Sequence, residues 1–449
     1  MNNGTKSRTN IVFPVEGVNR ELDFRLVLAT LAARSSNRIW VGQQKAVGRL
    51  IQALPSALYV GQNFSDGFPG TRYSTLKKRG GALIHLLEEG GVFNGGPETW
   101  QKILLRRLDP RGLDANDSVC AWGEWQRDYY RSLQPKCEEN IVATGHPRFD
   151  LLKPQFRPYF DKDVEKIRER WGDFVLINTN ITRANNASGL KYWFGNRKFY
   201  QPEDFEARTA LIDHWAHQLS LWGGFVKLVN RLAHQFPETT FVIRPHPAEI
   251  IENYTVFFDN IPNVHVVREG GIGAWLLASR AMIHDGCTTG LEAHFADVPV
   301  INWKPLHDER YDLFLPNSFG TVATTEAAAI DLTGRAIAGT LENPRAGALP
   351  PLATAMLHNL EHDAFGPLVN LIQAREKDVA AGEFDLRGWA RRENWRDARR
   401  KLRRRKPDGK WNGFSGERLD ERMNSAMRVA NKTVRWTLWN DAMLSIEAD

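Results

Sequence analysis

The sequence predicts an α/β protein built from two Rossmann-like, doubly wound domains, and three observations support this prediction. Short apolar runs alternate with helix-like stretches through the first 150 residues. A charged, proline-containing segment at 151–170 interrupts the alternation, which then starts again. The 449 residues also exceed the length of one ordinary hydrophobic core. Alternating strands and helices at this spacing indicate parallel sheets with helices on both faces.

The first domain, residues 1–150, contains six strand-like runs. They are NIVFPVEG, RIWVGQ, ALYVGQ, ALIHLLEEGG, SVCAWGE and NIVATGHP. The stretch NRELDFRLVLATLAARSS follows the first run and has a mostly apolar helical face after an Asn19 cap. We therefore expect a parallel sheet with intervening helices.

The second half of the chain repeats the pattern with one long helix. Residues 151–170 are predicted to be a linker with a leading helix, and 171–375 the second Rossmann-like domain. Its expected strands include FVLINTN, TFVIRPHP, AMIHDG and VPVINW, with a helix from about Phe205 to Phe236. Ligands of open α/β sheets bind beyond the carboxyl ends of the strands. We therefore expect the two domains to face a ligand-binding cleft.

Composition favours a soluble cytoplasmic protein. Apolar residues make up 42% of the chain and charged residues 25%, as in ordinary globular proteins. No run approaches the roughly 18 apolar residues of a membrane span, and the N-terminus has no apolar signal core. The three cysteines, Cys120, Cys137 and Cys287, are odd in number and lack metal-ligand spacing, which suits a reducing compartment.

Residues 376–449 are predicted to form a helical, basic tail. The segment Arg391–Lys406 contains eight Arg, two Lys and two acidic residues, and Trp395, Ala398 and Leu402 fall on one helical face. This pattern is typical of a helix on an anionic membrane surface, where each basic residue contributes about 1 kcal/mol. The alternative is a solvated helix that packs on the body through its tryptophans. Nucleic acid would attract the same charges, but no other feature supports it. KTVRWTLWNDAMLSI is expected to be a further helix.

The stretch HDGCTTGLEA is the first motif that could carry chemistry. A glycine-rich turn leads from a strand into a helix, whose first backbone N–H groups and dipole attract a phosphate or carboxylate. Thr288 and Thr289 add hydroxyls. The alternative is a capping box from Thr289 to Glu292. A thiol nucleophile at Cys287 is disfavoured because the turn is too crowded.

The stretch FVIRPHPAE is the second motif. Two prolines hold the backbone extended and place the imidazole of His246 at the end of a strand. That imidazole can donate to a phosphate oxygen, and Arg244 can supply positive charge. An isolated histidine in a loop is usually unremarkable, but this one falls in the same predicted domain as the Gly/Thr turn.

Together, RPHPAE and HDGCTTGLEA resemble the C-terminal domain of GT-B nucleotide-sugar transferases. More narrowly, the chain resembles bacterial surface carbohydrate biosynthesis proteins, related to capsule β-Kdo transferases, bacterial sialyltransferases and CDP-glycerol glycerophosphotransferases. The likeness covers roughly residues 10–305. It implies a metal-independent enzyme without a cofactor, in which the following residues bind the nucleotide sugar. His246 and Pro247 would contact the phosphate, Cys287, Thr288 and Thr289 would line it, and Glu292 would hold the ribose hydroxyls.

HLLEEGG resembles the acidic-acidic-glycine motif of the sialyltransferases and Kdo transferases, which implies a catalytic carboxylate at Glu88 or Glu89. Such a group would deprotonate the acceptor or attack the donor. Adjacent strand residues point to opposite faces, so only one of the two is expected to act. The alignment favours Glu88, and Glu89 remains a candidate. The alternative is that the stretch HLLEEGG forms a solvated acidic loop.

Several other residues are candidates for the cleft or can be set aside. Glu16 and Arg20, after the first strand, and Asn178 in INTN are possible cleft residues. His146 in GHPRFD is expected to shape the crossover between the domains and is not assigned a catalytic role. The Asp-x-Asp at Asp161 lies in the linker, which disfavours a metal site, and no GxGxxG follows the first strand, which disfavours a dinucleotide.

These observations predict a glycosyltransferase that builds a bacterial surface polysaccharide or glycolipid. The expected donor is a CMP-activated acidic sugar, with CMP-Kdo first, and the acceptor is a glycan or glycolipid. The expected location is the cytoplasm, peripheral on the inner membrane through Arg391–Lys406. The alternatives are a CDP-glycerol- or UDP-sugar-dependent transferase, a UDP-sugar epimerase, or a non-catalytic assembly scaffold.

Overall fold

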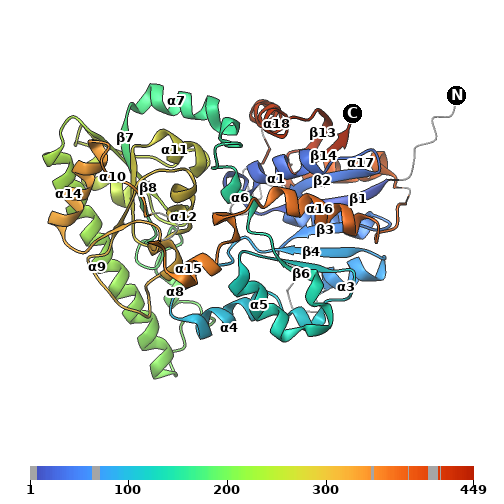
Figure 1. Ribbon diagram of the computed structural model, residues 1–449, viewed down its shortest axis with the longest axis horizontal. Helices are drawn as coiled ribbons and strands as arrows, with labels where there is room; N and C mark the ends of the chain where they lie inside the picture. Colours follow the sequence, from blue (N-terminus) through green and yellow to red (C-terminus); the bar gives the residue numbers. More distant parts are fainter. Residues whose placement is uncertain (1–7, 63–70, 345–347, 383, 403–412, 415) are drawn as a thin grey trace. The chain divides into compact units, whose positions relative to one another are not determined.

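The computed structural model describes residues 8–62, 71–344, 348–382, 384–402, 413–414 and 416–449. The chain divides into two compact units (Figure 1). Unit 1 comprises 1–91, 101–159 and 354–449, and unit 2 comprises 92–100 and 160–353. Each unit has its own sheet with helices on both faces, so the prediction of two Rossmann-like α/β units is confirmed.

Unit 1 contains an eight-stranded sheet in the order β13-β14-β2-β1-β3-β4-β5-β6. Its six parallel strands are β1 (Thr9–Val15), β2 (Asn37–Gln43), β3 (Leu58–Gly61), β4 (Ala82–Leu86), β5 (Ser118–Ala121) and β6 (Ile141–Ala143). These strands are nearly continuous runs of buried residues, as expected for strands covered on both faces.

A C-terminal hairpin extends this sheet at one edge. Strand β14 (Met443–Ala448) pairs antiparallel with β2, and β13 (Val434–Asn440) pairs antiparallel with β14. The prediction of a helix at KTVRWTLWNDAMLSI is therefore wrong. The alternation of VRWTLW suits a strand with one covered face, and Asn440 caps the turn by accepting from the N–H of Ala442.

Helices pack on both faces of the sheet in unit 1. They are α1 (Val18–Ala32), α2 (Gln44–Ala53), α3 (Thr71–Lys78), α5 (Glu124–Leu133), α6 (Pro147–Asp150), α16 (Phe365–Glu376), α17 (Leu386–Leu402) and α18 (Gly416–Ala430). Helix α1 contacts α6, α16 and α18, and is followed on the chain by β2. It begins after Gly17 and not at an Asn19 cap. Because α16 to α18 belong to unit 1, the chain returns to this unit after residue 353, ahead of the predicted boundary at 375.

Unit 2 contains a six-stranded parallel sheet in the order β12-β11-β10-β7-β8-β9. Its strands are β7 (Phe174–Thr179), β8 (Thr240–Pro245), β9 (Val264–Val266), β10 (Ala281–His284), β11 (Val300–Trp303) and β12 (Thr321–Ala323). Its helices are α7 (Asp161–Trp171), α8 (Lys191–Phe194), α9 (Phe205–Gln235), α10 (Glu252–Phe258), α11 (Ile272–Ala278), α12 (Thr288–Phe295), α13 (Phe314–Asn317) and α14 (Glu326–Ile337). Two more helices, α4 (Pro97–Arg107) and α15 (Pro351–Ala355), lie where the chain passes from one unit to the other.

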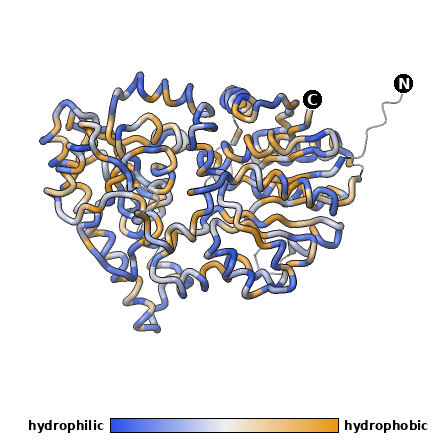
Figure 2. Tube along the Cα trace, in the orientation of Figure 1, coloured by the Kyte–Doolittle hydropathy of each residue, from blue (hydrophilic) through white to orange (hydrophobic). Residues whose placement is uncertain are grey.

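The core of unit 2 lies between its sheet and helices α9, α10 and α14. One face of β7, β8, β10 and β11 supplies apolar side chains such as Ile177, Ile243 and Ile283, which pack against Phe225 and Leu332. The strands are largely hydrophobic in Figure 2, whereas α7, which has no buried residue, is mostly hydrophilic. The long helix predicted near 205–236 is confirmed as α9.

Candidate functional site

In unit 2, a histidine organises the turn between β10 and α12. The ring of His284 is fully buried, and its Nδ1 accepts from the backbone N–H of Gly286 at 3.0 Å and from that of Cys287 at 3.3 Å. Gly286 has a φ of 72°, which favours glycine. Gly290 lies directly over the ring, and a Cβ there would meet it at 2.5 Å. Gly286 is therefore required by its backbone conformation and Gly290 by the ring of His284, independently of any ligand.

The capping box predicted from Thr289 to Glu292 is absent. Helix α12 starts at Thr288 with Cys287 as its N-cap, and the thiol of Cys287 contacts the hydroxyl of Thr289. Thr288 and Thr289 are partly exposed and form the first turn, where backbone N–H groups have no intrahelical acceptor. Glu292 is buried within the helix. The start of α12 thus keeps the donor character that suits an anion.

Cys287 is unsuited to nucleophilic chemistry in this turn. Burial raises the pKa of its thiol to about 11, although hydrogen bonds from Thr289 and the helix backbone act in the opposite direction. The thiolate is therefore a minor species at neutral pH, and the interpretation of Cys287 as a nucleophile is not supported. Its role is to begin the helix.

The loop after β8 places His246 on the surface. His246 and Pro247 are exposed, and the Nδ1 of His246 accepts from the backbone N–H of Ala248 at 3.1 Å. With Nδ1 acting as an acceptor, the proton of the neutral imidazole lies on Nε2. The turn therefore selects the tautomer whose Nε2–H is a donor, as phosphate recognition requires.

Glu249, the last residue of RPHPAE, is a buried anchor that sequence analysis did not assign. Its carboxylate accepts from the backbone N–H groups of His246 at 3.0 Å and Ile181 at 3.1 Å, and from the hydroxyls of Thr179 and Tyr254. It joins the loops that follow β7 and β8. The signal in the sequence was its place three residues after His246, where an acidic side chain can return to the loop backbone.

Arg244 and Asn178 occupy paired positions on β8 and β7 but do not form a charged anion site. The guanidinium of Arg244 donates to the carbonyls of Glu269 at 2.7 Å and Gly270 at 3.2 Å, and stacks over Trp275. Burial lowers its pKa to about 10, so it remains charged at neutral pH. Arg244 thus supports the 269–270 loop through its guanidinium. Asn178 is buried at the end of β7.

In unit 1, the two glutamates of HLLEEGG follow β4 and have opposite environments. Glu88 is fully buried, whereas the side chain of Glu89 is 41% exposed. The two residues lie in the turn after β4, where strand alternation does not apply, and the exposed member is Glu89 and not the favoured Glu88. A residue without exposed surface cannot contact an acceptor sugar in this conformation.

Glu88 belongs to a buried charged network. Its Oε1 accepts from Arg25 at 2.5 Å, and the Nε2 of His146 lies 3.3 Å from its Oε2. Arg148 donates to the Glu88 carbonyl at 2.8 Å. Burial would raise the pKa of Glu88, but the charge of Arg25 outweighs it and holds that pKa well below its usual range. Glu88 is therefore a buried anion that positions its neighbours.

His146, which the sequence analysis placed at the crossover between the domains, is part of this network. Its Nδ1 accepts from the backbone N–H of Arg148 at 3.2 Å, so the proton of the neutral ring lies on Nε2, which is 3.3 Å from the Glu88 carboxylate. Burial lowers the pKa of His146 to about 4 despite the nearby carboxylate, so the ring is neutral at neutral pH. His146, His246 and His284 thus share one local arrangement, in which Nδ1 accepts from a backbone N–H two residues on.

Two arginines hold Glu89 at the surface of unit 1. Arg20 bonds to Glu89 at 2.8 Å and to Glu21 at 3.0 Å, and Arg107 lies 3.4 Å from the other oxygen of Glu89. Partial burial acts to raise the pKa of Glu89, but the two arginines dominate and lower it. Glu16 donates its backbone N–H to the buried Glu21. The structure therefore places Arg20 beside Glu89, and Glu16 is connected to this cluster through Glu21.

Helix α17 packs one tryptophan and exposes another. Trp389 is buried against Trp40, while Trp395 is 60% exposed and stacks with Arg399. Glu393, on the covered side, pairs with Arg49 of α2. Residues 403–406, the end of the predicted basic helix, lie outside the described residues. Within the described part of the chain, no helix has both the length and the apolarity to cross a membrane.

Comparison with known proteins yields similarity only among solved structures. No protein-family model matches the chain, and no curated protein does. UDP-GlcNAc 2-epimerase from Neisseria meningitidis is 13% identical with a TM-score of 0.48, covering 82% of this chain and 100% of that one. UDP-GlcNAc 2-epimerase from Methanocaldococcus jannaschii is 9% identical with a TM-score of 0.49, covering 82% and 99%. The wall teichoic acid polymerase TagF is 11% identical with a TM-score of 0.41, covering 83% and 90%. At such low identity the likeness assigns no activity, and a functional argument depends on the residues of the two units themselves.

Proposed function

We propose that this protein is a nucleotide-sugar glycosyltransferase with its nucleotide-binding site on unit 2. The observation that carries the proposal is a pair of loops, one after β8 and one after β10. These two strands flank β7 in the sheet. One loop offers the Nε2–H of His246, and the other offers the first turn of α12 at Thr288 and Thr289. Strands two places apart are roughly 10 Å from each other, a span that a diphosphate or a nucleoside monophosphate with its sugar can bridge.

The proposed donor is a CMP-activated acidic sugar, with CMP-Kdo first. Its support is the joint occurrence of the His-Pro and Glu-Glu-Gly motifs, which resembles the Kdo and sialic acid enzymes. His246, Pro247 and the Cys287–Thr289 turn would hold the phosphate, and Glu292 would hold the ribose hydroxyls. Glu292 is buried, so this contact requires the nucleotide to approach the side of α12 closely.

Glu89 is the proposed catalytic carboxylate, and Glu88 is proposed to position it. The arginines beside Glu89 keep it ionised at neutral pH, so it can accept a proton from the acceptor hydroxyl or attack the anomeric carbon, but it cannot donate a proton. Glu88 fixes Arg148 and the backbone before Glu89. Because the two residues are adjacent, loss of the Glu88 network would displace Glu89 as well.

A nucleotide-binding screen tests the proposal. The protein is heated with CMP, CDP, UDP or GDP, and the melting temperature is compared with that of His246→Ala. We expect stabilisation by CMP that the variant loses, whereas His234→Ala, an exposed histidine on α9, keeps it. A response to UDP or CDP in place of CMP would overturn the donor and favour a UDP-sugar or CDP-glycerol enzyme. No response to any nucleotide would overturn the nucleotide site itself.

The epimerase and scaffold alternatives differ from the transferase in what they require. A UDP-sugar epimerase needs no acceptor, so conversion of a UDP-sugar to its epimer in the absence of any glycan would favour it. A scaffold needs no carboxylate, so unimpaired polysaccharide production by both Glu88→Ala and Glu89→Ala would favour it. The transferase is supported if nucleotide release requires the acceptor and Glu89.

We also propose that the exposed face of α17 contacts an anionic membrane surface. Trp395 is flanked there by the exposed Arg391, Arg392, Arg396 and Arg399. Removing the whole tail would remove β13 and β14 from the sheet of unit 1, so a surface variant is the better test. Replacement of the four arginines by Gln should abolish co-sedimentation with phosphatidylglycerol vesicles while thermal stability is kept. Unchanged co-sedimentation would refute the contact.

A further inference from the structure

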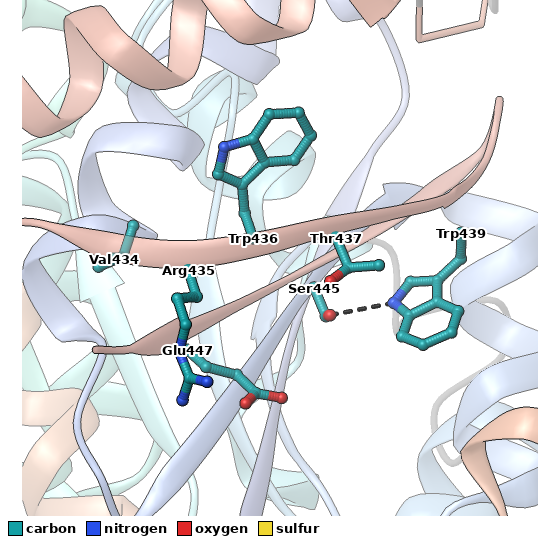
Figure 3. Close-up of a pocket in the computed structure, with 7 residues that line it drawn as sticks. All are labelled: Val434, Arg435, Trp436, Thr437, Trp439, Ser445 and Glu447. Atoms are coloured by element: carbon teal, nitrogen blue, oxygen red, sulfur yellow. Dashed lines mark hydrogen bonds between the residues drawn. The ribbon is translucent and has the colours of Figure 1, made fainter.

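A shallow pocket lies on the C-terminal hairpin of unit 1, at the free edge of the eight-stranded sheet (Figure 3). Its volume is ≈ 460 Å³, within the roughly 300–1,000 Å³ of small-molecule sites. It is lined by Val434, Arg435, Trp436, Thr437, Trp439, Ser445 and Glu447. None of these residues belongs to the motifs that the proposed function uses, so the pocket is an additional feature of the fold.

Two hydroxyls and an indole form one part of the pocket. Thr437 pairs with Ser445 across the hairpin, so their side chains lie side by side on the same face. The Nε1 of Trp439 donates to the Oγ of Ser445 at 3.0 Å, which fixes the orientation of the ring (Figure 3). A pyranose has an apolar C–H face and a rim of hydroxyls. A fixed indole beside two hydroxyls matches that combination.

Charged groups form the opposite part. Arg435 pairs across the hairpin with Glu447, which itself forms ion pairs with Arg8 and Arg38. Burial acts to raise the pKa of Glu447, but these arginines lower it, so the carboxylate is ionised. The guanidinium of Arg435 is 65% exposed, and the carboxylate of Asp449 is 3.6 Å from it. Because Glu447 is already paired with Arg8 and Arg38, the exposed guanidinium of Arg435 is the charged group of the lining that favours an anionic ligand.

We propose that this pocket binds an acidic sugar unit of a glycan, with its carboxylate or phosphate on Arg435 and its ring against Trp439. The proposal rests on the proposed function, because it makes the glycan the acceptor of the transfer. The two sites are nevertheless separate. Five strand spacings lie between β13 and β4, which leads to Glu89, or about 24 Å at the usual spacing. The pocket therefore holds the acceptor chain several sugar units away from the carboxylate that acts on its end.

Isothermal titration with the full-length protein tests this inference. The acidic probe is the tetramer of α2,8-linked N-acetylneuraminic acid, and maltotetraose is a neutral probe of equal length. We expect the acidic tetramer to bind at least about tenfold more tightly than maltotetraose, because charge-assisted bidentate bonds from arginine are the strongest contacts on offer. Arg435→Gln should weaken the binding of the acidic tetramer by about tenfold. Thr437→Val should weaken the binding of both probes.

The matched control is Arg197→Gln in unit 2, which removes another exposed arginine paired with a carboxylate at 3.3 Å. It should leave binding unchanged. Equal affinity of the native protein and Arg435→Gln for the acidic tetramer, or no binding of the tetramer, would overturn the pocket. Inorganic phosphate that binds as tightly as the tetramer would also overturn it, since the pocket would then recognise only an anion. CMP binding, measured on the same samples, separates this failure from a failure of the nucleotide site.

Discussion

At the scale of single residues, the two adjacent glutamates show how different surroundings give identical side chains different roles. Glu89 is partly exposed between Arg20 and Arg107, whereas Glu88 is enclosed with Arg25 and His146. The proposed reaction needs a carboxylate that can reach a sugar hydroxyl. Only the environment of Glu89 provides this.

Glu89→Gln should therefore lower the rate of sugar transfer with little effect on the fold. The amide keeps the shape of the side chain but cannot accept the acceptor proton, and general-base catalysis usually contributes about 10² to 10⁴-fold. Steady-state kinetics with a CMP-sugar donor would measure kcat, while CMP binding serves as the control for an intact nucleotide site. A kcat within about twofold of the native value would refute the catalytic assignment.

Glu88→Gln should instead destabilise unit 1. The substitution leaves Arg25, which is fully buried, without its charged partner. Breaking a buried ion pair in this way typically costs about 3–5 kcal/mol. Urea unfolding followed by tryptophan fluorescence would measure the loss, and Glu98→Gln on the surface of α4 is the matched control. Equal midpoints for the two variants would contradict the buried network around Glu88.

These roles also mark the limit of what the sequence could predict at this scale. The motif HLLEEGG and its place after a strand were enough to make one of the two glutamates a candidate, although both lie in the turn after β4, where strand alternation does not apply. They could not identify which, because the partner that encloses Glu88 is 63 residues away in sequence. The same holds for Arg244, whose charge suggested an anion site but whose donors go to backbone carbonyls of a distant loop.

At the scale of elements, the β10–α12 turn depends on close packing between a glycine and a histidine. Gly290 lies in the first turn of α12 against the buried ring of His284, which holds the preceding backbone through its Nδ1. The sequence indicated a phosphate-binding turn from its small residues. The ring beneath it could not be predicted, because a strand-end histidine carries no signal of its own burial.

Gly290→Ala should destabilise unit 2 and weaken nucleotide binding together. The new methyl group would lie 2.5 Å from the ring of His284, and overpacking of this kind costs about 1–3 kcal/mol. Gly223→Ala in α9 is the control, since its Cβ would meet nothing within 4 Å and alanine favours a helix by up to about 1 kcal/mol. Thermal melts with and without CMP would distinguish the two. A stable Gly290→Ala variant with normal CMP response would contradict the packing argument.

At the scale of the whole molecule, periodicity predicted the two parallel sheets well because buried strands leave long apolar runs. The periodicity of apolar residues was a poorer guide to the boundaries between the two units. The C-terminal hairpin pairs with β2, about 400 residues earlier, and such pairing depends on contacts that no local pattern records. The basic helix α17 was recognised by its composition. Its covered face depends on distant segments, because Trp389 packs against Trp40 and Glu393 pairs with Arg49.

The whole molecule also carries several histidines that folding keeps neutral. Burial lowers the pKa of His85, His146 and His284 to about 4, from the usual 6.5. Below pH 6.5 the unfolded chain takes up protons that the folded chain does not, so folding stability falls as the pH drops from 6.5 toward 4. Each such histidine contributes up to about 1.4 kcal/mol per pH unit. Asp285 opposes them, because burial raises its pKa to about 7.

His85 allows this pH dependence to be tested at one position. It lies on β4, and neither ring nitrogen has a hydrogen-bond partner among the described residues. An apolar side chain of similar size therefore leaves no unsatisfied group behind. His85→Leu should be more stable than the native protein at pH 5, and its loss of stability between pH 7 and pH 5 should be smaller by about 1–2 kcal/mol. Urea titrations at the two pH values measure both quantities, with the exposed His234→Gln as control. An unchanged pH dependence in His85→Leu would mean that this ring is protonated in the folded protein, and that its burial does not oppose its charge.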